Sequence, residues 1–350
     1  MSKHGVFIVE EATALTVPIS GRSSVQVVIG TAPVNMAEDP AAVVNTPILA
    51  NSAAEAMAAL GYSTDMGKGK YTLCQTMYAT NSIYQVSPVV YINVLDPARH
   101  KKSLEEAQYP VSQMQAVIPV EGVLINGLTV KNAEGSTALT LNTDYTAAFN
   151  SDGHLVLTLI EGGAGASAEN LTVSGEQIDP SAVTKTDIVG AYDPLTGKET
   201  GAEVIRQVFP KLGIVPGLLL APGWSQEPEV GIALAAKAAN INGVFKAMAL
   251  LDLDTTKAKK YTDTKRVKED SGFTSPYCYP LWPCDKVGDL ILAKSAVVGA
   301  LVSYVDASND DVPSNSPSNT LLGVTGQCLA DGTEVTLDQD QGSTVNEYGV

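Results

Sequence analysis

A strand, a crossover helix and a second strand are predicted between Ile214 and Asp254. The apolar run Leu218–Ala221 ends at a Pro-Gly pair, as expected of a strand that is covered on both faces. Pro228 suits a first helical turn, and four apolar residues follow on one helix face: Val230, Leu234, Ala238 and Ile241. An Asn-Gly pair then ends the helix, and Val244–Leu251 gives the next strand. A helix that joins two strands makes them parallel neighbours, so we expect an α/β core with a mainly parallel sheet.

The same patterns extend this core in both directions. Before the central unit we predict strands at Ser24–Gly30 and Val89–Leu95, and helices that start at the capping-box pair Ser52 and Glu55, at Tyr71 and at Glu203. After it we predict a basic helix up to Lys268, an aromatic edge strand within residues 271–283, a buried helix at Leu290–Val305, a polar loop at 306–319 and a strand at Thr333–Leu337.

Between residues 111 and 184 the signals are all of β type. Two apolar runs flank Asn150-Ser151-Asp152-Gly153, which has the composition of a hairpin turn. The helix and strand pattern resumes near residue 198, so we predict a small all-β domain, sandwich or barrel-like, inserted into the core. The expected organisation is an N-terminal arm at 1–22, the first part of the core at 23–103, the inserted β domain at 104–186 and the second part of the core at 187–350.

The first residues alternate between apolar and other side chains, and Pro18 disfavours a helix. This pattern predicts an extended arm whose apolar side chains are Val6, Ile8, Leu15, Val17 and Ile19. A single strand leaves its backbone N–H and C=O groups without partners. Such an arm therefore needs a further sheet to cover it.

Composition narrows the classes of function. The 350 residues are 45% hydrophobic, which is enough for cores in two or three domains. A formal net charge of -16 argues against a nucleic-acid partner, since affinity for phosphates needs clustered Lys and Arg. No signal peptide is apparent, and Lys294 interrupts the longest apolar helix, so we expect synthesis in a cytoplasm and no membrane insertion. The cysteines are expected to be reduced thiols: Cys74, Cys278, Cys284 and Cys328.

No catalytic motif stands out, and no cofactor is predicted. The histidines are far apart in the chain, Gly67-Lys68-Gly69-Lys70 lacks the spacing of a P-loop, and the glycines at 162–165 fit a hairpin linker. Asp252 and Asp254 are the strongest site candidates, because they follow a parallel strand at its carboxyl end, where two carboxylates could hold a divalent cation. The interpretation that we favour is that they cap the following turn.

Seven segments, in order along nearly the whole chain, resemble those of the contractile tail sheath proteins of bacteriophages and related phage-tail-like particles such as bacteriocins. They are HGVFIVEEATALTVPI, SVQVVIGTAPV, DYTAAFNSDGHLVLTLIEGG, LLLAPGWSQEPEVGIAL, FKAMALLDLD, SPYCYPLWP and SAVVGALVSYVDASNDDVPSNSPSN.

The resemblance implies a non-enzymatic structural protein of the virion, which forms six-membered rings stacked helically around a tail tube and shortens when the particle fires. Its implied partners are other copies of itself, the tail tube protein, and the baseplate and tail terminator proteins, with assembly in the bacterial host cytoplasm. The N-terminal arm would join neighbouring subunits by strand addition. Family members continue past the segment that matches Asn346–Gly349, so the chain resembles a sheath protein without its C-terminal domain.

Two alternatives stay open at this point. The first is a metal-dependent α/β enzyme that uses Asp252 and Asp254. The second is a β-rich adhesion or binding module attached to an inert core.

Overall fold

A six-stranded sheet forms the centre of the molecule. The computed structural model describes residues 19–20, 22–132, 137–313, 315–318 and 320–350. Neighbouring strands of the sheet are parallel, except that β3 is antiparallel to β5. The predicted mainly parallel α/β core is confirmed, with β15 at one edge as its proline-containing sequence predicts. In spatial order the strands are β15 (Cys278–Leu281), β14 (Met248–Asp252), β13 (Leu218–Leu220), β2 (Gln26–Gly30), β5 (Val89–Asn93) and β3 (Pro47–Ala50).

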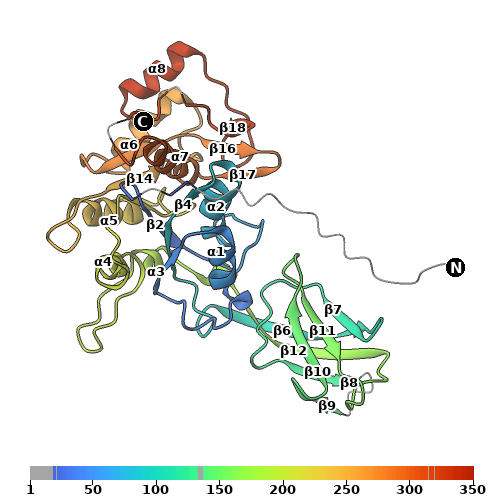
Figure 1. The fold of residues 1–350 in the computed structure, drawn as a ribbon. Coiled ribbons are helices and arrows are strands. Elements are labelled where there is room, and N and C mark those ends of the chain that lie inside the picture. Colours follow the sequence, from blue (N-terminus) through green and yellow to red (C-terminus); the bar gives the residue numbers. More distant parts are fainter. Residues whose placement is uncertain (1–18, 21, 133–136, 314, 319) are drawn as a thin grey trace.

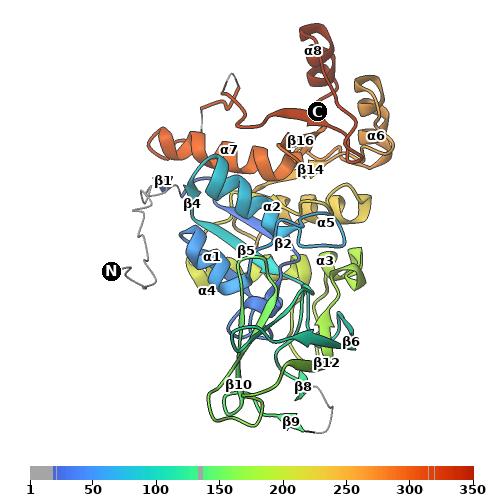
Figure 2. The ribbon, with the colours of Figure 1, turned by 90° about the vertical axis from the view of Figure 1, so that its right-hand side faces the viewer.

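Helices cover both faces of the central sheet. Figures 1 and 2 show α7 (Lys294–Ser308) and α2 (Leu73–Tyr78) on one side, and α5 (Pro228–Ala239) and α4 (Ile205–Leu212) on the other. Two further helices, α1 (Ala53–Leu60) and α3 (Lys185–Val189), pack beside β3 and α5. Because both faces are covered, β2 and β5 are buried along their whole length.

The central strand, helix and strand form as predicted, with one difference after the helix. α5 ends at Ala239, so Ile241 is buried from the following turn and not from the helix face. Asn242 and Gly243 have φ values of 55° and 74°, which form a left-handed turn. The turn delays β14 to Met248, and Val244, which was predicted in the strand, is 74% exposed.

The predicted helix at Leu290–Val305 is wrong at its start. Leu290–Leu292 is strand β17, and α7 begins only at Lys294. The start of α7 is fixed by acceptors from elsewhere in the chain: Ala293 N–H donates to Gln75 Oε1 at 2.6 Å, and Ser295 N–H donates to a carboxylate of the core at 2.8 Å. A continuous apolar run does not reveal such a boundary.

β17 belongs to a small antiparallel sheet, in which β16 (Cys284–Val287) lies between β17 and β18 (Gly326–Cys328). The predicted strand at Thr333–Leu337 is wrong. Within the described residues that stretch forms a single bridge, from Glu334 to Cys328.

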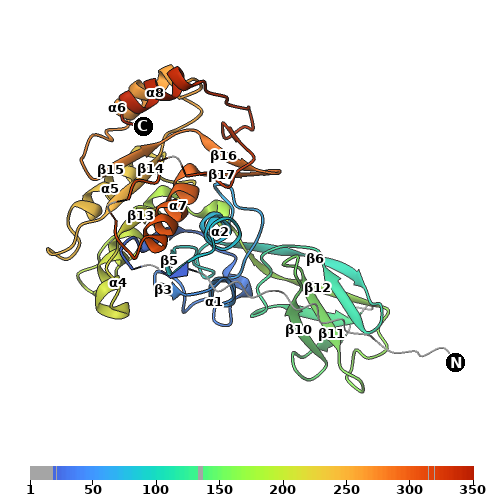
Figure 3. The same ribbon diagram turned by 45° about the horizontal axis from the view of Figure 1, so that its top comes forward.

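The predicted basic helix is present as α6 (Thr264–Asp270), and a last helix, α8 (Gln339–Glu347), lies beside it (Figure 3). Asp338 caps α8 by accepting Gln341 N–H at 2.8 Å. Lys268 Nζ of α6 donates to the carbonyl of Tyr348 at 2.8 Å, so this end of the chain is fixed to the core.

Residues 101–178 form a β-rich segment that projects from the core (Figure 1). It contains two antiparallel sheets, with strand orders β6-β12-β8-β9 and β10-β11-β7, and its hydrophobic cluster is separate from the main core. The predicted hairpin turn is confirmed, because Asn150 N–H donates to the carbonyl of His154 at 3.0 Å between β10 and β11. The strands are β6 (Lys101–Pro110), β7 (Gln115–Ile118), β8 (Thr129–Asn132), β9 (Ala138–Leu139), β10 (Tyr145–Phe149), β11 (Leu155–Leu159) and β12 (Asn170–Ile178).

The long strand β6 was not predicted from the sequence. Of its residues only Leu104 is buried, so the stretch offers no alternation of apolar side chains. β6 pairs with β12 along its length, and Lys101 lies opposite Ile178. The chain therefore enters and leaves the β-rich segment through neighbouring strands.

Candidate functional site

A cleft of about 510 Å³ lies at the carboxyl ends of the central strands, and Asp252 and Asp254 both line it. Asp252 ends β14 and Asp254 follows it, a position that predicts this placement. Lys68 and Glu227 also line the cleft, where they form an ion pair. Lys68 Nζ also lies 5.4 Å from the centroid of the Trp224 ring, which is a cation–π contact.

The carboxylate of Asp252 is buried and holds three elements together. Its Oδ1 accepts the Ser295 N–H at 2.8 Å, and its Oδ2 accepts the hydroxyls of Ser295 at 2.6 Å and Ser225 at 2.8 Å. Ser225 follows β13 and Ser295 opens α7, so this side chain fixes both to the end of β14. Burial raises the pKa of Asp252, and the three hydrogen bonds act against that rise.

Asp254 caps the next turn. Its Oδ1 accepts the N–H of Thr256 at 2.9 Å and the Thr256 hydroxyl at 2.6 Å, and its Oδ2 lies 3.1 Å from Lys257 Nζ. Partial burial raises the pKa of Asp254, but these partners outweigh it, so the pKa lies below the usual value. Asp254 accepts a backbone N–H of the turn that follows it, as the capping interpretation predicts. For Asp252 that interpretation is wrong, because its backbone donor is Ser295 at the start of α7. Within the described part of the chain, no cluster of three or more His, Cys, Asp and Glu residues is placed to hold a metal ion.

A buried ion pair behind the cleft was missed in the sequence. Lys294 Nζ lies 2.6 Å from Asp285 Oδ1, and neither side chain is exposed to solvent by more than a tenth. Burial raises the pKa of Asp285, and the charge of Lys294 lowers it in part. A lysine and a serine inside the apolar run Leu290–Val305 are the signal that could have pointed to these buried polar contacts.

The lysines of the glycine-containing loop at 67–70 are engaged by carboxylates. Lys68 pairs with Glu227, and Lys70 Nζ lies 2.6 Å from Asp65. The loop at 162–165 is fixed by Asp144, whose Oδ1 accepts the N–H of Ala164 at 2.8 Å. Backbone hydrogen bonds lower the pKa of Asp144. This loop joins β11 to β12, which belong to different sheets, so it is a linker between strands, as predicted, but not a hairpin.

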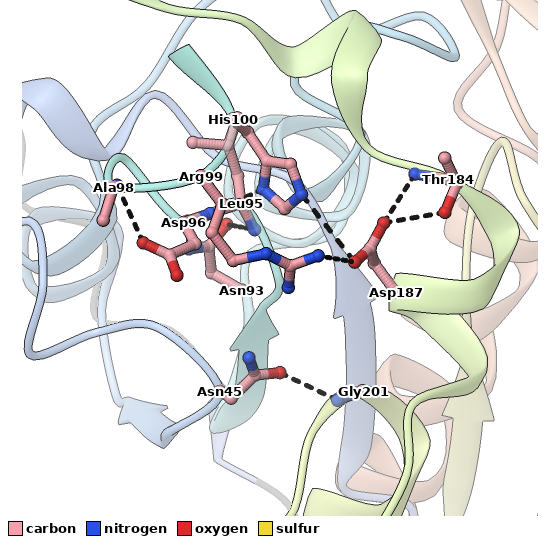
Figure 4. Close-up of polar contacts among 10 residues, drawn as sticks. All are labelled: Asn45, Asn93, Leu95, Asp96, Ala98, Arg99, His100, Thr184, Asp187 and Gly201. Carbon is pink, nitrogen blue, oxygen red and sulfur yellow. Dashed lines mark hydrogen bonds and ion pairs between the residues drawn. The ribbon is translucent and has the colours of Figure 1, made fainter.

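A polar cluster ties the base of the β-rich segment to the core (Figure 4). His100, which directly precedes β6, accepts the N–H of Asp96 at Nδ1 over 2.9 Å, and its Nε2 lies 3.7 Å from Asp187 Oδ1. Asp187, on α3, also pairs with Arg99 at 3.3 Å and accepts the N–H and hydroxyl of Thr184 at 2.9 and 2.8 Å. The chain segments that enter and leave the β-rich segment therefore share one carboxylate.

The charge states in this cluster follow from burial. His100 is 4% exposed, and burial lowers its pKa although Asp187 acts in the opposite direction. Because Nδ1 accepts a hydrogen bond, the proton of the neutral ring is on Nε2 and faces Asp187. Burial raises the pKa of Asp187, but hydrogen bonds from Thr184 and the charges of His100 and Arg99 bring it below the usual value.

Of the five predicted arm residues, only Ile19 lies within the described residues. It begins β1 (Ile19–Ser20), which pairs in parallel with β4 (Val86–Ser87) of the same chain. Directly after β1, Arg22 N–H donates to Asp311 Oδ1 at 2.7 Å. The other four lie outside the described residues: Val6, Ile8, Leu15 and Val17. The assignment of the arm to contacts between subunits stays a prediction.

The cysteines are free thiols, as expected. Cys74 lies on α2 and Cys278 on β15, whereas Cys284 and Cys328 lie opposite each other on β16 and β18. Nowhere in the described ranges is there a helix that combines the length and the apolar character required to cross a membrane.

Comparison with known proteins favours one of the classes of function that the sequence leaves open. Over 244 residues, the chain is 28% identical to the tail sheath protein of Burkholderia phage BcepMu, and the alignment covers 69% of this chain. In sequence, the chain is similar to a phage tail sheath protein. The resemblance seen in its sequence segments is thus confirmed, and the metal-dependent enzyme is not favoured. The chain spans about half the length of the curated protein that it matches, with 47% of that protein covered.

No family model matches the chain. Two solved structures resemble it more distantly. A sheath tail protein from Listeria innocua has 12% identity and a TM-score of 0.43, over 94% of this chain and 64% of its own. A sheath tail protein from Desulfitobacterium hafniense has 10% identity and a TM-score of 0.40, over 98% of this chain and 70% of its own.

Proposed function

We propose that the chain is a structural subunit of a contractile tail sheath, which polymerises around a tail tube and contracts to drive the tube through a cell envelope. The observation that carries this proposal is the 28% identity with a tail sheath protein over 244 residues. The cleft supports a non-enzymatic role, because both of its aspartates are used as acceptors within the fold. No cofactor is proposed.

The proposed partners follow from the same role. They are other copies of the chain in stacked six-membered rings, the tail tube protein, and the baseplate and terminator proteins at the tail ends. The proposed location is the virion, after assembly in the cytoplasm of the bacterial host. The net charge of -16 gives no support for a nucleic-acid partner.

Within this role, we propose that residues 104–186 are an inserted all-β domain. Its support is the separate hydrophobic cluster, which includes Ile118, Leu155, Leu157 and Leu171. The strand β6 begins at Lys101, slightly before the proposed boundary, and β12 ends at Ile178. The polar cluster around Asp187 lies where this domain would meet the core.

Negative-stain electron microscopy of the protein expressed from its complete gene tests the proposed function. We expect rings or tubes of constant diameter at high protein concentration. A monodisperse monomer under all conditions of salt and pH that keep the tail particle intact would contradict the sheath role. The 350-residue chain, imaged in parallel, shows whether these residues alone carry the assembly contacts.

Hydrogen exchange tests the proposed role of the N-terminal arm. Residues 5–18 hold four of the apolar arm side chains, and we propose that their backbone groups pair with a neighbouring subunit. We expect slow exchange of these residues in the assembly and fast exchange in the isolated chain. Equal protection in the isolated monomer would make the arm an ordinary part of the fold.

A further inference from the structure

Two cysteines face each other across the small antiparallel sheet of the core. Cys284 on β16 is the register partner of Cys328 on β18. Directly opposed residues on antiparallel strands have Cα atoms about 4.5 to 5.5 Å apart and side chains on one face of the sheet. Both spacings fall within the range of about 4.4 to 6.8 Å that a disulfide bond requires. The Cα spacing of this register pair is therefore within the range of a cross-strand bond.

The two thiols differ in their access to solvent. Cys284 is half-buried and lines the cleft at the end of the central sheet. Cys328 is fully buried behind it. A small reagent in the cleft therefore meets Cys284 before Cys328.

Neither of the remaining cysteines is placed in this way. Cys278 on β15 lies opposite Ala249, and Cys74 lies on α2. In the described strands, no second pair of cysteines is in register. The feature is thus confined to one site and gives matched control positions elsewhere in the chain.

We propose that Cys284 and Cys328 are a reversible thiol pair, which a small-molecule disulfide in the cleft converts into a cross-strand disulfide bond. The thiolate of Cys284 attacks one sulfur of the small disulfide, forms a mixed disulfide and releases one small thiolate. The thiolate of Cys328 then attacks the sulfur of Cys284, which closes the protein bond and releases the second small thiolate. Two protein thiols are oxidised, and one small disulfide is reduced to two thiolates, which take up the two protons that the protein thiols lose.

The surroundings make this exchange slow at neutral pH. Burial raises the pKa of Cys284 to about 12, and it also raises the pKa of Cys328. The thiolate is the reacting form. As long as the pH is below the pKa of the thiol, the rate therefore rises by up to about tenfold for each unit by which the pH is increased. Opposed Cβ atoms are about 4.5 to 5.5 Å apart, whereas a disulfide needs about 3.5 to 4.5 Å, so the strands must move together and the bond is readily reduced again.

The bond has a defined structural consequence. It closes a loop that contains α7 and the polar segment after it, and it ties β18 to β16. We therefore expect oxidation to raise the thermal midpoint and to slow hydrogen exchange in β18. This inference is independent of the proposed sheath function, because it concerns one chain alone.

The test uses the full 350-residue chain with oxidised glutathione at pH 8.5. Remaining thiols are alkylated, and intact mass and peptide mapping follow. We expect two thiols to be lost, with one linked peptide pair that contains Cys284 and Cys328, and full recovery of all four thiols after mild reduction. The loss should be at least tenfold slower at pH 7 than at pH 8.5. Cys278→Ser should leave it unchanged, and Cys284→Ser and Cys328→Ser should each abolish the linked pair.

Three results would overturn the proposal. They are retention of all four free thiols, accumulation of glutathione on Cys284 without closure, and a linked pair that involves Cys74 or Cys278. Peptide mapping of the unsubstituted chain decides among these results even if a serine variant does not fold. Electron microscopy of the sheath assembly is unaffected by any of them, so a failure here is distinct from a failure of the proposed function.

Discussion

Asp252 shows how a single carboxylate can hold several elements in place. Replacement by Asn keeps its shape but puts an NH2 group against one of the donors from Ser225 and Ser295. We expect Asp252→Asn to lower the free energy of unfolding by about 1–3 kcal/mol, because a buried donor loses its acceptor. Urea denaturation measures this change. The matched variant Asp254→Asn, at a more exposed cap, should cost less than about 1 kcal/mol. Equal losses would mean that burial does not govern the role of Asp252.

The same two residues separate the structural from the enzymatic interpretation. Calorimetric titration with magnesium and with calcium should give no saturable site, since the carboxylate oxygens already accept hydrogen bonds from Ser295, Ser225 and Thr256. The double variant with Asn at positions 252 and 254 should give the same heats as the unsubstituted chain. A specific site that this double substitution removes would restore the metal-dependent enzyme.

His100 makes stability depend on pH. Its pKa is lowered from 6.5 by burial, so the unfolded chain binds the proton more readily than the folded one. The stabilisation is therefore complete above about pH 6.5 and is lost as the pH falls below it. His100→Asn should flatten the dependence of the urea midpoint between pH 5 and pH 6.5, whereas His154→Asn, in the β10–β11 turn, should leave the slope unchanged. An unchanged slope in the His100 variant would contradict this assignment.

At the scale of elements, two helical glycines have opposite surroundings. A Cβ on Gly299 of α7 would lie 2.6 Å from Leu220 Cδ2 and 2.7 Å from Gln26 Oε1, whereas a Cβ on Gly342 of α8 would meet no atom within 4 Å. We expect Gly299→Ala to destabilise the chain by about 1–3 kcal/mol through overpacking. Gly342→Ala should stabilise it by up to about 1 kcal/mol through helix propensity. Thermal unfolding measures both variants, and a stabilising Gly299→Ala would show that α7 can shift from the sheet.

The elements that the sequence predicts well are those with local signals. The start of α1 was predicted from Ser52, which accepts Glu55 N–H at 3.2 Å, although Glu55 reaches back to Asn51 instead of to Ser52. Elements fixed by distant partners were missed. β6 is polar and is held by β12, and the boundary between β17 and α7 depends on Gln75 and Asp252. Likewise the strand-end position of Asp252 was predictable, but its serine partners, which come from distant parts of the sequence, were not.

At the scale of the whole molecule, the β-rich segment should fold when it is separated from the core. We expect an excised segment of residues 101–179 to show a cooperative β-type thermal transition, because it has its own hydrophobic cluster. Its midpoint should be lower than in the intact chain, since Leu124 and Ile178 are buried against the main core and become exposed. Circular dichroism measures this transition. An unfolded segment, beside an intact chain that folds, would show that the core is needed to form the two sheets.

The pairing of Lys101 with Ile178 has a consequence for how this molecule can vary. Opposed residues on antiparallel strands lie only about 5 Å apart, a distance that a two-residue turn can span. In the path of the chain, everything between these two residues takes the place of one tight surface loop, and its main packing contact with the core is Leu124. We therefore expect that the β-rich segment can be exchanged for a short turn, or for an unrelated domain whose two ends are adjacent. The strand order of the central sheet should stay the same.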